Sequence, residues 1–221
     1  MLARTVALAS ALAAAAAGAE VGIDVSHHSG EIDWRLVAQE EVDFVYVKAS
    51  EGVDDADPQF DAHWRRLGEL AIPRGAYHFY VTEDDPDAQA DFFLSRWRPA
   101  PGDLPPVVDV ELLGHGTEGP IAPRLRRFLD RVEAAAGVVP ILYTSPRFAD
   151  AHLGAEFGRY PLWVAEYEVE APTLPAAWSE WLLWQFEGDA TVPGIEKSAD
   201  RSRLHERASL AALRIPAAGR E

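Results

Sequence analysis

Two acidic residues separated by a single valine end an apolar segment of the chain. They are Asp109 and Glu111, in the segment Pro106–Glu111 (PVVDVE). Because side chains of a β-strand alternate between its two faces, both carboxylates face the same side if this segment is a strand. Asp24 stands in a similar apolar segment, Val21–Ser26 (VGIDVS). A buried carboxylate is costly unless it is hydrogen-bonded or paired, so these acids indicate a functional site.

Crowded acids of this kind favour proton transfer. Like-charged neighbours raise the pKa of at least one carboxyl group, so one acid keeps its proton at neutral pH while another stays ionised. Cleavage of a glycosidic bond needs both forms, one to protonate the leaving oxygen and one to act in the ionised state. The alternative is an edge strand whose acids face solvent.

Aromatic residues fall in or at the ends of similar apolar segments. Their rings offer flat apolar faces to sugar rings, while their polar tips form hydrogen bonds. Core packing is the alternative for each ring taken singly. The aromatic residues concerned are Tyr77, Tyr80, Tyr143, Trp163, Tyr167, Trp184 and Phe186.

The acids and aromatics need strands to position them, and the chain predicts a βα barrel. Seven short segments rich in β-branched and aromatic residues predict strands at 21–26, 44–50, 75–80, 106–111, 139–145, 162–167 and 182–187. Helical spacing predicts helices at 33–39, 57–70, 86–97 and 123–136, the last with Leu125, Phe128, Leu129 and Val132 facing inward.

The alternation of strands and helices predicts parallel βαβ units. Beyond Tyr167 the helical spacing fades while strand-like segments continue, so we expect an α/β fold, a βα barrel whose last strands lack full helices. A final helix is expected at 204–213. Catalytic groups of such a barrel lie at the C-terminal ends of its strands, which is where Asp109 and Glu111 fall.

Length and composition bound the domain organisation. The 221 residues are 48% hydrophobic and 25% charged, as in a soluble globular chain. Residues 1–19 (MLARTVALASALAAAAAGA) predict a secretory signal peptide cleaved after Ala19, with an Ala-rich N-terminal helix as the alternative. Residues 20–221 then form one barrel domain, exported to the periplasm or the outside, which we expect to be a monomer.

Charge and cysteine content exclude several kinds of partner. The formal net charge of −16 makes nucleic acid and anionic membrane surfaces poor partners. The chain has no cysteine, which excludes disulfides, thiolate nucleophiles, Cys-ligated zinc and an acylated membrane anchor.

Several segments, taken in order, resemble the family 25 glycoside hydrolases, the Chalaropsis-type lysozymes or muramidases. They span the chain from Val21 to the region of Leu204, and the Asp-x-Glu on the fourth strand is part of the pattern. The matching segments are Gly22–Gly30 (GIDVSHHSG), Phe44–Gly52 (FVYVKASEG), Arg74–Tyr80 (RGAYHFY), Pro105–Glu111 (PPVVDVE), Pro140–Ser145 (PILYTS), Tyr160–Tyr167 (YPLWVAEY), Leu182–Ile195 (LLWQFEGDATVPGI) and Ser198–Asp200 (SAD).

The resemblance implies a modified TIM-like α/β barrel, (β/α)5(β)3, with fewer helices than strands. It also implies hydrolysis of the β-1,4 bond between N-acetylmuramic acid and N-acetylglucosamine in peptidoglycan, without a metal or other cofactor. It implies that Glu111 is the general acid. Asp109 is its partner, orienting a substrate acetamido group or stabilising positive charge at the anomeric carbon. Asp24 and Asp200 complete the acidic cluster, tuning the pKa of Glu111 or positioning water.

The expected substrate contacts come from the aromatic set and one further acid. Tyr77 is a candidate for contacting the reacting sugar. Glu51 matches a family signature and supports the site, with an ion pair to an arginine as the alternative. The remaining candidate binding residues are Tyr80, Tyr143, Tyr167 and Trp184.

Two other functions remain open on these residues. A metal-dependent barrel hydrolase would draw its ligands from Asp24, His27, His28, His78, Asp109, Glu111 and Asp200, although adjacent histidines in a strand would point to opposite faces. A non-catalytic glycan-binding protein on the same barrel is the second. The chain departs from the family pattern at Ser29 and at Arg201 and Ser202, after Asp200.

Overall fold

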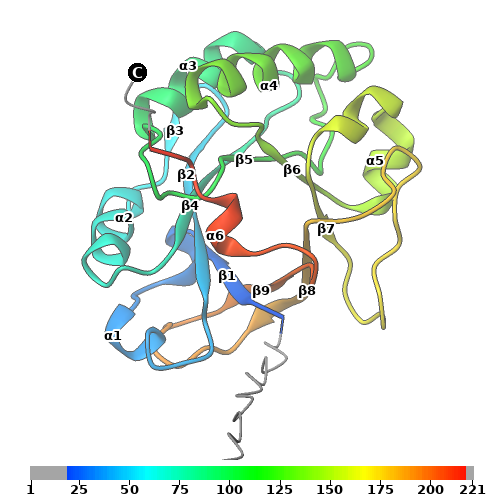
Figure 1. The fold of residues 1–221 in the computed structure, drawn as a ribbon. Helices are drawn as coiled ribbons and strands as arrows, with labels where there is room; N and C mark the ends of the chain where they lie inside the picture. The colour runs from blue at the N-terminus through cyan, green and yellow to red at the C-terminus, as the bar shows by residue number, and fades with distance from the viewer. Residues whose placement is uncertain (1–18, 218–221) are drawn as a thin grey trace, which may run out of the picture.

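Eight strands close a barrel in the computed structural model of this chain, which describes residues 19–217 (Figure 1). Around the barrel the order is β1, β2, β4, β5, β6, β7, β8, β9, and β9 returns to β1. The bounds are β1 Val21–Val25, β2 Phe44–Glu51, β4 Arg74–Phe79, β5 Val107–Asp109, β6 Ile141–Thr144, β7 Leu162–Ala165, β8 Leu183–Ala190 and β9 Ala199–Leu204. A two-residue strand, β3 (Asp55–Ala56), pairs with β2 outside the barrel.

The strand directions confirm the predicted βα barrel and add one strand to it. Neighbours from β1 through β8 pair in parallel, whereas β9 is antiparallel to both β8 and β1. All seven predicted strand segments are strands, with ends shifted by a few residues. The β9 segment was not among them, because ADRSRL is polar and lacks β-branched residues.

Helices surround the barrel after its early strands, and the four predicted ones are confirmed, three with shorter ends and the fourth one residue longer (Figure 1). They are α1 (Trp34–Val37), α2 (Phe60–Glu69), α3 (Pro86–Arg96) and α4 (Ala122–Ala136); α5 (Pro146–His152) and the 3₁₀ helices η1 (His27–Ser29) and η2 (Ala155–Arg159) were too short for a periodic pattern. No full helix lies between β7 and β8 or between β8 and β9, as predicted.

Local sequence explains where two of these helices begin and end. The Asp85 carboxylate accepts hydrogen bonds from the backbone of Asp87 and Ala88, which caps α3 just before Pro86. Gly137, with a φ of 68°, ends α4 in the left-handed conformation that glycine adopts without strain. On α4 the four residues expected to face inward, Leu125, Phe128, Leu129 and Val132, are buried.

The predicted final helix is largely wrong. Only α6 (Leu210–Leu213) is helical, since residues 204 and before belong to β9. The buried Leu210 of α6 packs into the barrel interior beside Leu204, at the end where β1 starts. The backbone N–H of Leu210 donates to the Glu20 carboxylate. The N-terminal end of the barrel is therefore plugged, and the opposite end is left for a site.

Two apolar clusters show which way each strand residue faces. Phe44 and Tyr46 of β2 belong to the interior cluster, while the alternate residues Val45 and Val47 belong to the cluster under the helices. This alternation assigns a face to every barrel residue that carries a functional group.

The predicted signal peptide lies outside the described residues, apart from Ala19. Among the described residues, no helix has the length and apolar character needed to span a membrane.

Candidate active site

The predicted acids meet in one cavity at the C-terminal ends of the parallel strands. Its volume is about 190 Å³. The lining residues are Asp24, Ser26, His28, Lys48, Tyr77, Phe79, Val107, Asp109, Glu111, Tyr143, Trp163, Gln185 and Asp200. A second hollow of about 170 Å³ shares Asp24, Tyr77 and Asp200 with it and extends to Asp189 and Ser198. Together they form a groove across the mouth of the barrel.

Strand alternation brings the carboxylates inward. Val108 and Val110 pack under the helices, and so Asp109 and Glu111 face the interior, as predicted. In β1, Ile23 and Val25 likewise belong to the outer cluster and Asp24 faces inward. Solvent-facing acids on an edge strand are excluded, because β1 and β5 each pair on both sides.

Asp200 joins the cluster through the antiparallel strand β9. It lies directly opposite Asp24 in the β1–β9 register. Between the two carboxylates lies the side chain of Gln185, whose Nε2 donates to Asp24 Oδ2 at 2.8 Å and to Asp200 Oδ2 at 3.3 Å. The backbone N–H of Asp189 donates to Asp200 Oδ1 at 2.9 Å.

Burial raises the pKa values of all four acids, and repulsion within the cluster adds to the effect at Asp24, Asp109 and Glu111. Burial and the charge of Asp200 raise the pKa of Asp24 well above its usual range, and burial and the charge of Glu111 do the same for the pKa of Asp109. The pKa of Glu111 is raised by burial and by Asp200. Burial raises the pKa of Asp200, an effect opposed by the Asp189 N–H. The cluster therefore retains protons at pH values where isolated carboxyl groups are ionised.

Asp109 combines an unpaired oxygen with a nearby cation. Its Oδ1 is buried and has no hydrogen-bond partner among the described residues. The ammonium group of Lys48 lowers the pKa of Asp109, against the larger effect of burial. Lys48 is in turn held by Glu51, with Nζ 2.6 Å from Oε2. An oxygen buried without a partner is an acceptor available to a ligand.

Two tyrosines converge on Gln185 from the next strands. The hydroxyls of Tyr143 and Tyr167 both donate to its Oε1, the first at 2.8 Å. Tyr143 is largely buried in the interior, whereas Tyr167 is 43% exposed at the rim. Tyr77 of β4 lines the groove in both hollows, and burial together with the charge of Asp24 raises its pKa well above the usual range.

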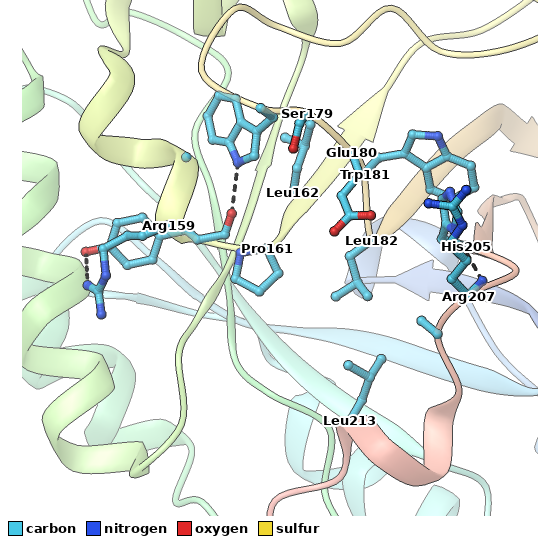
Figure 2. A pocket seen from close by; sticks show the side chains of 14 residues that line it. Arg159, Pro161, Leu162, Ser179, Glu180, Trp181, Leu182, His205, Arg207 and Leu213 are labelled. Carbon is cyan, nitrogen blue, oxygen red and sulfur yellow. Dashed lines mark hydrogen bonds between the residues drawn. The ribbon is translucent and has the colours of Figure 1, made fainter.

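A larger cavity, of about 390 Å³, lies at the opposite end of the barrel (Figure 2). It is bounded by the start of β7, the start of β8 and α6, with Trp181 edge-on to His205 at a centroid distance of 4.5 Å. Its lining contains one acid, Glu180, and none of the predicted site residues. This cavity therefore lacks the clustered carboxyl groups of the smaller groove.

Comparison with known proteins agrees with this geometry. The family model for glycosyl hydrolases family 25 matches residues 23–195. The chain belongs to this family. As a family 25 member it is a glycoside hydrolase.

Relatives of this family 25 hydrolase include lysozymes. Lysozyme M1 of Streptomyces globisporus is 32% identical over 200 residues, covering 83% of this chain and 67% of that protein. An uncharacterized protein, YegX, of Escherichia coli strain K12 is 34% identical over 184 residues, covering 81% and 67%. The crystal structure of the bacterial lysozyme from Streptomyces coelicolor superposes with a TM-score of 0.81 at 30% identity, covering 89% of this chain and 96% of that one.

Two predicted binding residues of the family 25 hydrolase lie away from the groove. Tyr80 follows β4 with its ring edge-on to Phe128 of α4, and its buried hydroxyl has no partner among the described residues. Trp184 faces the outer side of β8, where Arg203 lies over its ring and Nε1 donates to the Glu166 carbonyl. Alternation of side chains between the two faces of a strand explains both positions. Tyr77 of β4 and Gln185 of β8 face the interior, so Tyr80 and Trp184 face outward, away from the predicted substrate contacts.

Glu51 does not line the groove either. Its partner is Lys48 rather than an arginine, and its charge also acts directly on Asp109, whose pKa it raises. Ser29, where the chain departs from the family pattern, caps the short η1 helix: its hydroxyl accepts from the backbone of Ser26. Ser202, another departure, accepts a hydrogen bond from Trp163 Nε1 at 3.0 Å.

The groove also contains residues that the sequence did not single out as site residues. Trp163 was noted among the aromatics, and the alternation along β7 places it inside. His28 was considered only as a metal ligand, and Gln185, Lys48, Ser26 and Phe79 had no distinguishing signal. Period two counted from Asp24 and from Tyr46 turns Ser26 and Lys48 inward.

The histidines do not gather as a metal site would require. His27 and His28 lie in η1 rather than in a strand, with ring centroids 3.9 Å apart. His27 Nδ1 is 2.8 Å from Asp57 Oδ2, and His78 is buried beside Ser50 and Gln89. Within residues 19–217, no group of three or more histidine or acidic side chains is arranged to hold a metal ion.

Proposed function

We propose that this protein is a lysozyme, a muramidase that hydrolyses the β-1,4 bond between N-acetylmuramic acid and N-acetylglucosamine in peptidoglycan. The observation that carries the proposal is the meeting of four carboxyl groups in one groove of a family 25 barrel. Similarity to Lysozyme M1 supports the same substrate.

Glu111 is the general acid in this proposal. It is the acid just beyond the end of β5, and its raised pKa keeps a proton available for the leaving oxygen at mildly acidic pH. Asp109 acts beside it. The unpaired Oδ1 of Asp109 is available to accept the N–H of a substrate acetamido group, and its charge stabilises positive charge at the anomeric carbon.

Asp24 and Asp200 are assigned to the support of this pair. Asp200 raises the pKa of Glu111 through its charge, which favours the protonated acid. Both carboxylates border the second hollow of the groove, so they are also placed to position a water molecule for attack.

Sugar binding is assigned to the aromatic lining. Tyr77, Tyr143 and Trp163 present rings inside the groove, and Tyr167 stands at its rim. The net charge of −16 gives no long-range attraction to peptidoglycan, whose peptide and lactyl carboxylates are negative. Affinity therefore comes from stacking and hydrogen bonds within the groove.

We further propose that residues 20–221 act as a single exported domain and as a monomer. The support is the sequence of residues 1–19, which has the order of a secretory signal peptide. Mass spectrometry of the protein recovered outside the cytoplasm should give a chain that begins at Glu20.

The decisive experiment incubates purified peptidoglycan with the wild type and with Glu111→Gln. The wild type should release muropeptides that end in reducing muramic acid. Since general acid catalysis contributes about 10²- to 10⁴-fold, the variant should lose at least a hundredfold in rate. Glu118→Gln, an exposed acid further along the same loop, is the matched control. Peptidoglycan binding without new reducing ends would reject the proposal in favour of a glycan-binding protein.

A further inference from the structure

Gln185 uses every hydrogen-bonding position of its side chain within the groove. It lies on β8 and is 1% exposed. Its Nε2 donates to Asp24 and Asp200, and its Oε1 accepts from Tyr143 and Tyr167. An amide side chain has two N–H donors and one oxygen with two lone pairs, so four partners from four other strands or their ends saturate it.

The chemistry of these partners fixes the orientation of the amide. A hydroxyl both donates and accepts, and would tolerate either end of the amide. An ionised carboxylate only accepts, and Asp200 accepts an N–H on each of its oxygens, so the amide nitrogen of Gln185 must face Asp200 and, with it, Asp24 Oδ2. The two tyrosine hydroxyls then donate to the oxygen. The side chain of Gln185 is thus held in one orientation, with both N–H groups directed at the acids.

The two acids are bonded unequally. Asp200 receives an N–H on each oxygen, one from Gln185 and one from the backbone of Asp189. Asp24 receives only the Gln185 N–H, on Oδ2, and its Oδ1 has no hydrogen-bond partner among the described residues. Hydrogen bonds from N–H groups favour the ionised form of a carboxyl group, so Asp200 is the better stabilised anion.

We propose that Gln185 is a positioning residue that makes Asp24 and Asp200 a pair sharing one proton, with that proton on Asp24 Oδ1. The neutral Asp24 carboxyl then offers an O–H donor to an oxygen of the bound glycan, while Asp200 stays ionised beside Glu111. This inference deepens the proposed function and rests on it for the identity of the glycan.

The electrostatics of the groove support this distribution of the proton. Burial and the charge of Asp200 raise the pKa of Asp24, and the Gln185 N–H lowers it. The other charged or titratable groups that line the groove or act on the pair are Asp109 and Glu111 of the β5 region, Lys48 of β2, Tyr77 of β4, Tyr143 of β6, Tyr167 after β7, Asp189 of β8 and His28 of η1.

The test compares Gln185→Leu and Gln185→Glu with the wild type in the full chain. Carboxyl ¹³C NMR follows the titration of the aspartates, and kcat/KM on peptidoglycan is measured against pH. Loss of the N–H donors in Gln185→Leu should raise the apparent pKa of the Asp24–Asp200 pair by about one unit. The acidic limb of kcat/KM should then move to higher pH by the same amount. The rate at the optimum should fall about tenfold or more.

Gln185→Glu keeps the shape of the side chain but donates only when protonated. Its activity should be lost at neutral pH and partly recovered as the pH falls, which a purely structural role would not produce. The matched control is Gln89→Leu, because Gln89 is equally buried but bonds His78 and Val81 outside the groove. It should lower Tm without moving the pH profile.

The experiment distinguishes failure of the Gln185 inference from failure of the proposed function. If both Gln185 variants keep the wild-type titration and pH profile and lose only stability, as Gln89→Leu does, Gln185 is structural and the inference is wrong. If the wild type releases no reducing muramic acid, the proposed function fails. The NMR titration still decides whether Gln185 sets the proton of the pair.

Discussion

Lys48 Nζ lies 2.6 Å from Glu51 Oε2, and this ion pair presents a lysine ammonium group to the acidic groove. The lysine lowers the pKa of Asp109, while the charge of Glu51 raises it. The two charges of this β2 ion pair therefore have opposite effects on the pKa of Asp109. Glu51 contributes to the site although it does not line the groove.

Lys48→Met should consequently raise the pKa of Asp109 further. If Asp109 acts in its ionised form, the acidic limb of kcat/KM against pH moves to higher pH and activity below the optimum falls about tenfold, as a shift of one pKa unit implies. Lys197→Met replaces the only other lysine, which is exposed, and serves as the control. An unmoved acidic limb in Lys48→Met would remove this lysine from the electrostatics of the site.

The raised pKa of Glu111 predicts the alkaline limb of the same profile. A general acid must hold its proton, so activity should persist above the ordinary glutamic acid pKa of about 4.3, be highest at mildly acidic pH and then decline. Asp200→Asn removes the charge that raises this pKa and should shift the decline to lower pH. Glu187→Gln, an acid on the neighbouring strand β8, should not. A flat profile from acid to alkaline pH would count against Glu111 as the acid.

Asp109→Asn should stabilise the fold while abolishing activity. The folded chain binds the Asp109 proton more tightly than the unfolded chain does, so stability falls as pH rises from the unfolded pKa of about 3.9 through the folded one. Asparagine avoids that loss. At pH 7 the variant should therefore have a higher Tm than the wild type. Thermal unfolding at pH 3 and pH 7 checks the sign: the gain must vanish at pH 3.

Tyr80→Phe and Tyr143→Phe make the same chemical change on opposite sides of the barrel wall. The Tyr80 hydroxyl is buried without a partner, so its loss should leave activity unchanged and Tm equal or higher. The Tyr143 hydroxyl holds Gln185, so its loss should lower kcat/KM about tenfold. Steady-state kinetics gives kcat/KM and thermal melting gives Tm for both variants. Lower activity at unchanged Tm in Tyr80→Phe would instead indicate that Tyr80 contacts the substrate.

Period-two alternation predicted the acids well, because it needs only the neighbours in the same strand. Asp109 and Glu111 share a face, and the valines around them show which face is covered by helices. The same rule applied to the aromatics would have turned Tyr80 and Trp184 outward and Trp163 inward. Ring chemistry alone does not distinguish the two faces of a strand.

Other parts of the site carry no signal within a single segment. Gln185 is a neutral amide between aromatics, and its importance comes only from partners on β1, β6, β9 and the end of β7. The polar segment Ala199–Leu204 becomes a strand because β1 and β8 pair with it on both sides, a tertiary effect that overrides weak local preference.

The antiparallel strand that seals the cylinder also supplies Asp200, so the last strand to leave the ribosome is the one that completes the acidic cluster. A nascent chain that still lacks β9 contains Glu111 but not Asp200, which raises the pKa of Glu111. Its β1, which carries Asp24, also has no partner strand on the β9 side. Hydrolytic capacity therefore arrives only with the finished fold.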